Sequence, residues 1–405
     1  MKYLHLLLVL LLSSFLASCS SSGEANSDQS NDGLKIINVD LSEAREGALS
    51  EFFEPAIEYI WLQDDSEDAQ LGGLNKIFFY EDKIFTIDIF GCKCIKIFDR
   101  SGKYLSKIRA YGEGPEKYLD FDDAIIVKDE VLILGVYPPK LMWFSLDGEF
   151  IKEEKLKEHI ESGVYSDLEK RYYFYANPRE IGKYFISSVD TDFKDTLMAF
   201  PFELKAYYGN YSGRNTYKKS ENSIYSGMSF NDTIYQVKSG EFIPKLAFDF
   251  GEYAQSIDEL KNIEESSTAL EELDFINKRS KLYFVPHQWF ITESKFYSGF
   301  NYQEDFYNVF YDRESQQTRI IKGRISDDLD EVFDPYSILH QFNDAKVGVT
   351  IPGKTLFKTL QKKKAELGLE AFEEYVKGTG KSFAHAAYAA KDSENPVLIV
   401  YTVKK

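Results

Sequence analysis

The fold of this chain is decided by a short stretch that recurs along it, Ile97-Phe98-Asp99-Arg100-Ser101-Gly102-Lys103. An apolar pair precedes a polar turn, and a second strand-like run follows. Asp, Ser and Gly tolerate the positive φ values that tight turns need, so the stretch predicts a β-hairpin. The same order is found in three further stretches, Trp143–Phe150, Ile234–Phe242 and Phe310–Gln316.

The spacing of these turns is regular. Gly148 follows Gly102 by 46 residues, and Gly240 follows Gly148 by 92 residues, which is twice that period. The period therefore predicts another hairpin near residue 194, where Val189–Thr196 joins two strand-like runs.

Two wider gaps predict two helical insertions. The first is expected over Ser256–Asn277, where Ser256 and Glu259 form a plausible capping box. The second is expected over Thr355–Val376, with an interruption near Gly368. A last turn is expected at Lys391–Asn395, after this second insertion.

Hairpins that recur every 40–50 residues are typical of β-propellers. Turns near residues 102, 148, 194, 240, 316 and 393 predict an all-β fold with six blades. The ring must close, because an open propeller leaves two sheet edges unpaired. We expect the N-terminal strand Ile57–Leu62 and the C-terminal strand Pro396–Tyr401 to lie in one blade and to close the ring.

With these pieces in order, the chain resembles the NHL-like six-bladed β-propeller lipoproteins of Gram-negative bacteria. The matching stretches are Val39–Ser42, Ile57–Leu62, Ile84–Asp88, Ile97–Lys103, Gly112–Tyr118, Phe230–Tyr235 and Asn395–Leu398. The second blade departs from the pattern, because Gly135 stands where the Asp88 pattern has an acid and Pro138-Pro139 interrupts its strands. The resemblance implies a propeller over residues 36–405, and it implies neither catalytic residues nor a cofactor.

The N-terminal region has the features of a lipoprotein signal. An apolar run too short to span a bilayer predicts a signal peptide over residues 1–18. Leu16-Ala17-Ser18-Cys19 resembles the bacterial lipobox, which implies a lipid on the Cys19 thiol. Residues 19–35 are polar and acidic, so we expect a flexible tether. The lipid would then be the sole membrane contact, at the outer membrane, on its cell-surface or periplasmic side.

Charge and cysteine content exclude several classes of protein. The chain has 66 acidic and 48 basic side chains and a net charge of −18, which argues against a nucleic-acid partner. Beyond Cys19, the chain contains Cys92 and Cys94 alone, so no disulfide framework is expected. A bond between residues two apart would be strained, and these two cysteines are expected to be structural thiols, with a redox pair as the alternative.

Few side chains stand out as candidates for a site. Gly112-Glu113-Gly114-Pro115 predicts a tight turn, because no helix with a lysine follows to make a phosphate loop. Arg109 and Tyr118 flank this turn and are candidate ligand-binding residues at the channel mouth. Tyr207, Tyr208 and Tyr211 are candidates for stacking on a sugar. The histidines are far apart, so no metal site is predicted.

Together these observations predict a non-catalytic module that binds a ligand, a glycan or a protein at the outer membrane. Two alternatives stay open. The first is a hydrolase or lyase with a metal-dependent site at the channel mouth, assembled from single ligands on separate blades. The second is a structural subunit of an outer-membrane uptake complex.

Overall fold

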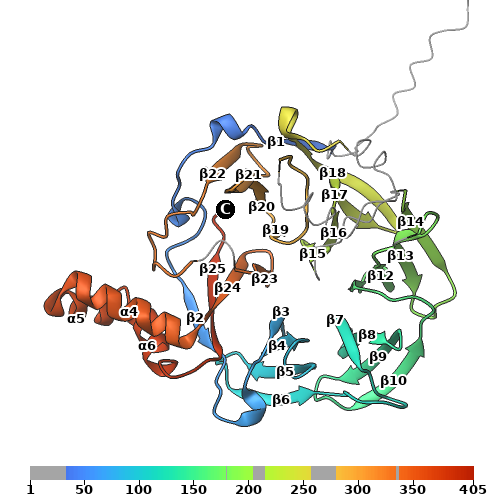
Figure 1. The fold of residues 1–405 in the computed structure, drawn as a ribbon, viewed down its shortest axis with the longest axis horizontal. Helices are drawn as coiled ribbons and strands as arrows, with labels where there is room; N and C mark the ends of the chain where they lie inside the picture. The colour runs from blue at the N-terminus through green and yellow to red at the C-terminus, as the bar shows by residue number, and fades with distance from the viewer. Residues whose placement is uncertain (1–32, 179, 204–214, 257–279, 334–336) are drawn as a thin grey trace, which may run out of the picture. The chain divides into compact units, whose positions relative to one another are not determined.

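The computed structural model describes residues 33–178, 180–203, 215–256, 280–333 and 337–405. Its strands form six small sheets arranged as the blades of a propeller (Figure 1). Blades 1 to 3 contain β3 (Leu74–Tyr80), β4 (Lys83–Asp88), β5 (Cys94–Asp99) and β6 (Tyr104–Ile108); β7 (Asp120–Val127), β8 (Glu130–Tyr137), β9 (Lys140–Ser145) and β10 (Phe150–Lys155); and β11 (Ser162–Ser166), β12 (Arg171–Tyr175), β13 (Tyr184–Asp190) and β14 (Thr196–Pro201).

The other three blades follow the same order. Blades 4 to 6 contain β15 (Tyr217–Ser220), β16 (Ser223–Met228), β17 (Asn231–Lys238) and β18 (Glu241–Asp249); β19 (Trp289–Ile291), β20 (Lys295–Tyr302), β21 (Asp305–Asp312) and β22 (Thr318–Lys322); and β23 (His340–Gln341), β24 (Lys346–Pro352), β25 (Pro396–Thr402) and β2 (Glu58–Trp61). In each blade the first strand in this order lies closest to the ring centre (Figure 1). The predicted six-bladed propeller is therefore confirmed.

The recurring turn joins the third and fourth strands of blades 1 to 5. In blade 1 the Asp99 side chain accepts hydrogen bonds from the backbone nitrogens of Ser101 (2.8 Å) and Lys103 (3.0 Å), and Gly102 has a φ of +85°. The hairpin predicted near residue 194 joins β13 and β14 and is confirmed. The turn predicted at Lys391–Asn395 lies one connection earlier in its blade, since it leads from the helical insertion into the third strand, β25.

The ring closes where the two ends of the propeller meet. β2 pairs with β25 in antiparallel register, with Glu58 opposite Val400 and Trp61 opposite Val397. Asn395 extends this junction, because its side-chain nitrogen donates to the carbonyl oxygen of Leu62 at 3.0 Å. The expected closure by N- and C-terminal strands in one blade is confirmed.

The segment before β2 contacts two further blades. β1 (Lys35–Asn38) adds to blade 4 as a fifth strand, parallel to β18. Arg45 then bridges to Ile321 in β22, and Ala48 bridges to Ser326. We call Lys35–Trp61 the N-terminal belt, because it covers the outer edges of blades 4 and 5 before it completes blade 6. Covered edges cannot pair with another chain.

Within the described residues, three α-helices form one insertion between β24 and β25, and they project outward from blade 6 (Figure 1). They are α4 (Gly353–Leu367), α5 (Leu369–Lys377) and α6 (Lys381–Ala389). The predicted break is at Gly368, which has a φ of +77°. The alanine-rich α6 lies beyond the predicted insertion; its Phe383 ring packs 5.6 Å from that of Tyr59. The other predicted insertion, Ser256–Asn277, lies outside the described residues except for Ser256.

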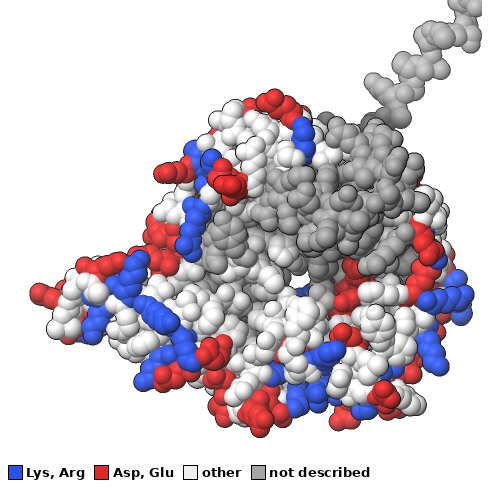
Figure 2. Space-filling model, in the orientation of Figure 1, with Lys and Arg blue, Asp and Glu red and all other residues white. Residues whose placement is uncertain are grey.

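Four short 3₁₀ turns complete the described structure: η1 (Leu41–Glu43), η2 (Leu49–Glu51), η3 (Glu67–Ala69) and η4 (Gly251–Tyr253). Among the described helices, none has the length and apolar character needed to cross a bilayer. Acidic and basic side chains are interspersed along the outer margin of the face seen in Figure 2.

Blade 6 contains a buried acidic residue beside the closing strands. Asp330 is 3% exposed, and its carboxyl accepts hydrogen bonds from the hydroxyls of Tyr59 and, at 3.5 Å, Tyr401. The nearby Asp327 accepts from the backbone nitrogens of Val332 (2.7 Å) and Phe333 (2.8 Å). The Asp327 carboxylate is thus satisfied by the backbone, whereas Asp330 faces two phenols.

Candidate functional site

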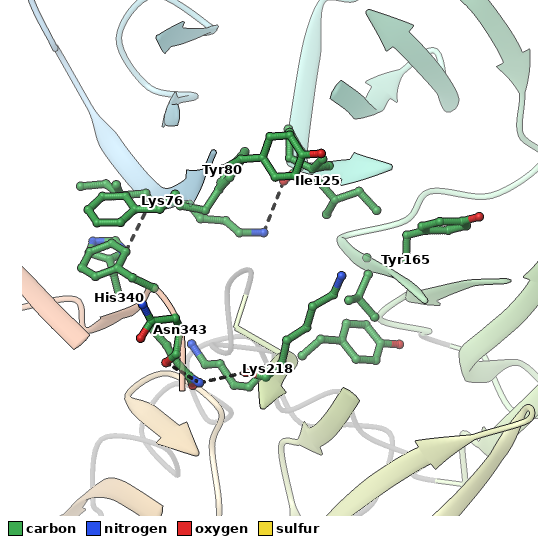
Figure 3. A pocket seen from close by; sticks show the side chains of 18 of the residues that line it. Lys76, Tyr80, Ile125, Tyr165, Lys218, His340 and Asn343 are labelled. Atoms are coloured by element: carbon green, nitrogen blue, oxygen red, sulfur yellow. Dashed lines mark hydrogen bonds between the residues drawn. The ribbon is translucent and has the colours of Figure 1, made fainter. Parts of the chain in front are cut away.

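A cavity of about 620 Å³ occupies the centre of the ring. The first strands of five blades contribute to its wall: β3, β7, β11, β15 and β23 (Figure 3). Its rim comes from the turns that follow these strands, with Asp129, Asp167 and Asn343 among the lining residues. Side chains alternate across a strand, so each first strand presents one set of side chains to a neighbouring blade and another to the centre.

Four lysines line this cavity, from three blades: Lys76 on β3, Lys128 in the turn after β7, and Lys218 and Lys219 on β15. Lys76 is paired, because its Nζ lies 2.7 Å from Oδ1 of the fully buried Asp123 on β7. Asp123 also accepts hydrogen bonds from the backbone nitrogens of Ala124 (2.8 Å) and Gly163 (3.3 Å). The charge of Lys76 is therefore balanced within the protein.

Lys218 has a different environment. It is 8% exposed, and its Nζ donates to the side-chain oxygen of Asn215 at 3.3 Å. Its ammonium group also lies 5.8 Å from the centroid of the Trp289 ring. Burial, and then the charge of Lys76, lower the pKa of Lys218 to about 7.

Lys219 lies closer to the rim. Its Nζ is 3.8 Å from Asp167, and both side chains are more than half exposed, so the pair contributes little to stability. Tyr80 lies on the opposite rim and donates a hydrogen bond to Asp129 at 2.7 Å. Asp167 and Asp129, the two acidic residues at the rim, therefore each already contact a side chain of the protein.

His340 and Gln341, the two residues of β23, join the blades around the cavity. His340 is buried, and its burial together with the charges of Lys218 and Lys76 lowers its pKa to about 3, so the ring is neutral at physiological pH. Its Nδ1 accepts from the backbone nitrogen of Ile77 at 3.4 Å. The Gln341 side-chain nitrogen donates to the carbonyl oxygens of Lys219 (3.0 Å) and Ile291 (2.6 Å).

The rest of the wall is largely apolar and aromatic. Phe79 and Phe342 stack with their ring centroids 4.1 Å apart. The apolar and aromatic lining residues are Ile77, Phe78, Phe79, Tyr80, Ala124, Ile125, Ile126, Val164, Tyr165, Tyr217 and Phe342. A concave, mostly apolar wall with a few charged and amide groups is the usual composition of a small-molecule site.

The candidate residues Arg109 and Tyr118 lie away from this cavity, on the connection between β6 and β7. Arg109 is exposed, and its Nε donates to the carbonyl oxygen of Cys92 at 3.0 Å. Tyr118 is fully buried and donates to the carbonyl oxygen of Lys93 at 2.8 Å, so it has a structural role. Gly112 donates its backbone N–H to the carbonyl oxygen of Tyr118 at 2.9 Å, and this bond closes a loop over residues 112–118, where a tight turn was predicted.

Other predicted residues have different outcomes. Tyr207, Tyr208, Tyr211 and Cys19 lie outside the described residues. Cys92 and Cys94 are joined by a disulfide, so the expectation of structural thiols is wrong. The loop between β4 and β5 brings the two sulfur atoms together although the cysteines are two residues apart. Among the described residues, no group of three His, Cys, Asp or Glu side chains is arranged to hold a metal ion.

Sequence reasoning missed Lys76, Lys218 and His340. Each belongs to a different stretch, and the Lys218-Lys219 pair has the composition of an exposed strand end. The one available signal was position: each lies in or beside the first strand of a blade, the strand that faces the centre of a propeller.

Comparison with known proteins places this fold in a family. A candidate exported protein from Bacteroides fragilis has a crystal structure with a TM-score of 0.71 at 16% identity, covering 91% of this chain and 100% of that one. A member of the DUF4221 family from Bacteroides vulgatus matches with a TM-score of 0.51 at 10% identity, covering 87% and 97%. At such identities the likeness shows the fold alone. No curated protein matches the sequence. A family model matches residues 34–402, and the chain therefore belongs to the family described as a domain of unknown function, DUF4934.

Proposed function

We propose that this protein is an exported, lipid-anchored binding module that captures a small ligand in its central cavity without transforming it. The observation that carries the proposal is the cavity itself, about 620 Å³ in volume and lined from five blades. Its volume lies within the range of about 300–1,000 Å³ that is typical of small-molecule sites. Its aromatic rings and the side-chain nitrogen of Asn343 at the rim suit a ligand with both apolar faces and hydroxyl groups, such as a sugar.

The proposed location follows from the sequence and from the relatives. The lipobox-like Leu16-Ala17-Ser18-Cys19 supports a lipid anchor at the outer membrane, and the B. fragilis protein of the same fold is described as a candidate exported protein. That this family is a branch of the NHL-like six-bladed lipoproteins is part of the same proposal.

The cavity can be tested with a pair of variants at its rim. Asp167 lines the mouth and contacts Lys219 at 3.8 Å, so its replacement removes one weak contact. Asp167→Trp places a bulky ring at the opening, whereas Asp167→Asn removes the same charge without adding bulk.

The measurement is isothermal titration calorimetry with compounds selected from a thermal-shift screen of mono- and disaccharides and small organic acids. We expect one-to-one binding to the wild type and to Asp167→Asn, and at least tenfold weaker binding to Asp167→Trp. Equal binding to all three proteins, or no saturable binding in the screen, would refute capture in the cavity.

A further inference from the structure

We propose that the central cavity takes a ligand with a carboxylate or phosphate group, and that Lys218 holds this anionic group. The proposal rests on the proposed function, because it names the class of ligand for the same cavity. Its starting point is the charge balance of the residues that line the wall.

Lys218 is a buried cation without an anionic partner. It is 8% exposed, and within the described part of the chain it contacts a neutral amide oxygen of Asn215 and the ring of Trp289, but no carboxylate. Lysine is almost never fully buried unless it is paired, because an uncompensated charge is costly to remove from water. A fold that keeps such a lysine beside a cavity leaves room for an anion to complete the pair.

The neighbouring charges do not compensate Lys218. Asp123 is occupied by Lys76 at 2.7 Å and by two backbone nitrogens. Asp167 lies at the rim beside Lys219. His340 adds no charge because it is neutral. When Lys218 is protonated, the wall around it therefore has a positive charge that no described carboxylate contacts, in a chain whose net charge is −18.

This imbalance specifies the ligand chemistry. The acids among the lining residues, Asp129 and Asp167, lie at the rim, so the protonated Lys218 attracts an anion to the wall of the cavity. One unpaired lysine calls for one anionic group, and the aromatic and amide groups contact the uncharged remainder of the ligand. Lysine binds carboxylate and phosphate alike as a point charge, so both remain within the same ligand class.

The test uses the anionic group alone. Sodium acetate and sodium phosphate are titrated separately at pH 6, against sodium chloride at equal ionic strength, while the thermal midpoint of unfolding is followed. We expect acetate, phosphate or both to raise the midpoint saturably by about 1–3 °C for the wild type. The two arms distinguish a carboxylate site from a phosphate site.

Two lysine-to-methionine variants locate the response. Lys218→Met keeps an unbranched side chain that is one atom shorter, removes the charge and should fold at least as stably as the wild type. Lys152→Met is the matched control: Lys152 also lies over a tryptophan ring, 4.5 Å from the centroid of Trp143, but on the outermost strand of blade 2. We expect the anion response to vanish in Lys218→Met and to persist in Lys152→Met.

The outcomes separate this proposal from the proposed function. If neither anion stabilises the wild type beyond chloride, or if Lys218→Met responds as the wild type does, the anion site is refuted. If Asp167→Trp loses binding of a neutral sugar and neither anion stabilises the wild type, ligand capture in the cavity is supported and an anionic ligand is refuted. If the anion response depends on Lys218 but every compound binds Asp167→Trp as it binds the wild type, the anion site is supported and capture of a larger ligand in the cavity is refuted.

Discussion

Replacing Asp330 with asparagine should remove a loss of stability that the wild-type propeller undergoes as the pH rises from about 5 to 8. Burial, followed by the hydrogen bond with Asp327 and its charge, raises the pKa of Asp330 to about 8. The folded protein therefore keeps a proton on Asp330 at neutral pH. An asparagine mimics this protonated state, since its amide can donate toward Asp327 while its oxygen accepts from Tyr59.

The sign and size follow from proton linkage. In the unfolded chain an aspartate has a pKa of about 3.9, so above this pH the unfolded state has lost the proton that the folded state retains. The stabilising contribution of the buried, protonated Asp330 is complete below about pH 4, and it is lost as the pH rises toward 8. The slope is at most about 1.4 kcal/mol per pH unit, which gives an upper limit of about 4 kcal/mol between pH 5 and 8.

The assay is urea unfolding at pH 5.5, 7.0 and 8.5 for the wild type, Asp330→Asn and a control. Asp328→Asn is the control, because Asp328 is exposed and bonded to Ser50 at the surface. We compare the free energy of unfolding of Asp330→Asn with that of the wild type at each pH. This difference should favour the variant by about 2–4 kcal/mol more at pH 8.5 than at pH 5.5. The reasoning is refuted if Asp330→Asn loses stability with pH as steeply as the wild type does.

Three further predictions concern the closure and the anchor. Deleting residues 396–405 removes β25 and should abolish cooperative unfolding in circular dichroism; a truncated chain that melts like the full one would contradict closure by this strand. Gly102→Ala should destabilise the protein by about 2–4 kcal/mol more than Gly148→Ala in urea unfolding. Both glycines have a positive φ, but only at Gly102 would a Cβ collide with the carbonyl oxygen of Trp61. Equal losses of stability in the two variants would argue against this contact. Cys19→Ser should move the protein from the membrane to the soluble fraction, and a variant that still sediments with membranes would refute lipidation.

Most of the fold was predictable because the repeat is encoded locally. Each turn near Gly102, Gly148 and Gly240 uses small or acidic residues whose conformational needs are visible in sequence. The N-terminal belt was not predictable, because Lys35–Asn38 is a short run whose strand pairing depends on an edge more than 200 residues away. Helix α6 was missed because Lys381–Ala389 has little polar contrast and its pattern is set by packing against blade 6.

The candidate site was hardly predictable at all. Lys76, Asp123 and Lys218 come from three blades, and what matters about them is whether each charge has a partner. Sequence spacing places residues on a strand but does not show which opposite charges meet across a ring. Tyr118 illustrates the reverse error, since its place beside a glycine-rich turn suggested a channel mouth while the fold buries it in the core.

The N-terminal belt also affects when the protein can finish folding. A ribosome releases Lys35–Trp61 early, yet the partners of this segment are β18, β22 and β25, which come much later in the chain. At about 5–20 residues per second, the strand that meets Trp61 emerges some tens of seconds later. Throughout that delay blade 6 lacks its third strand, so its sheet is incomplete. Closure of the ring therefore waits until β25 has been synthesised, however early its partner β2 appears.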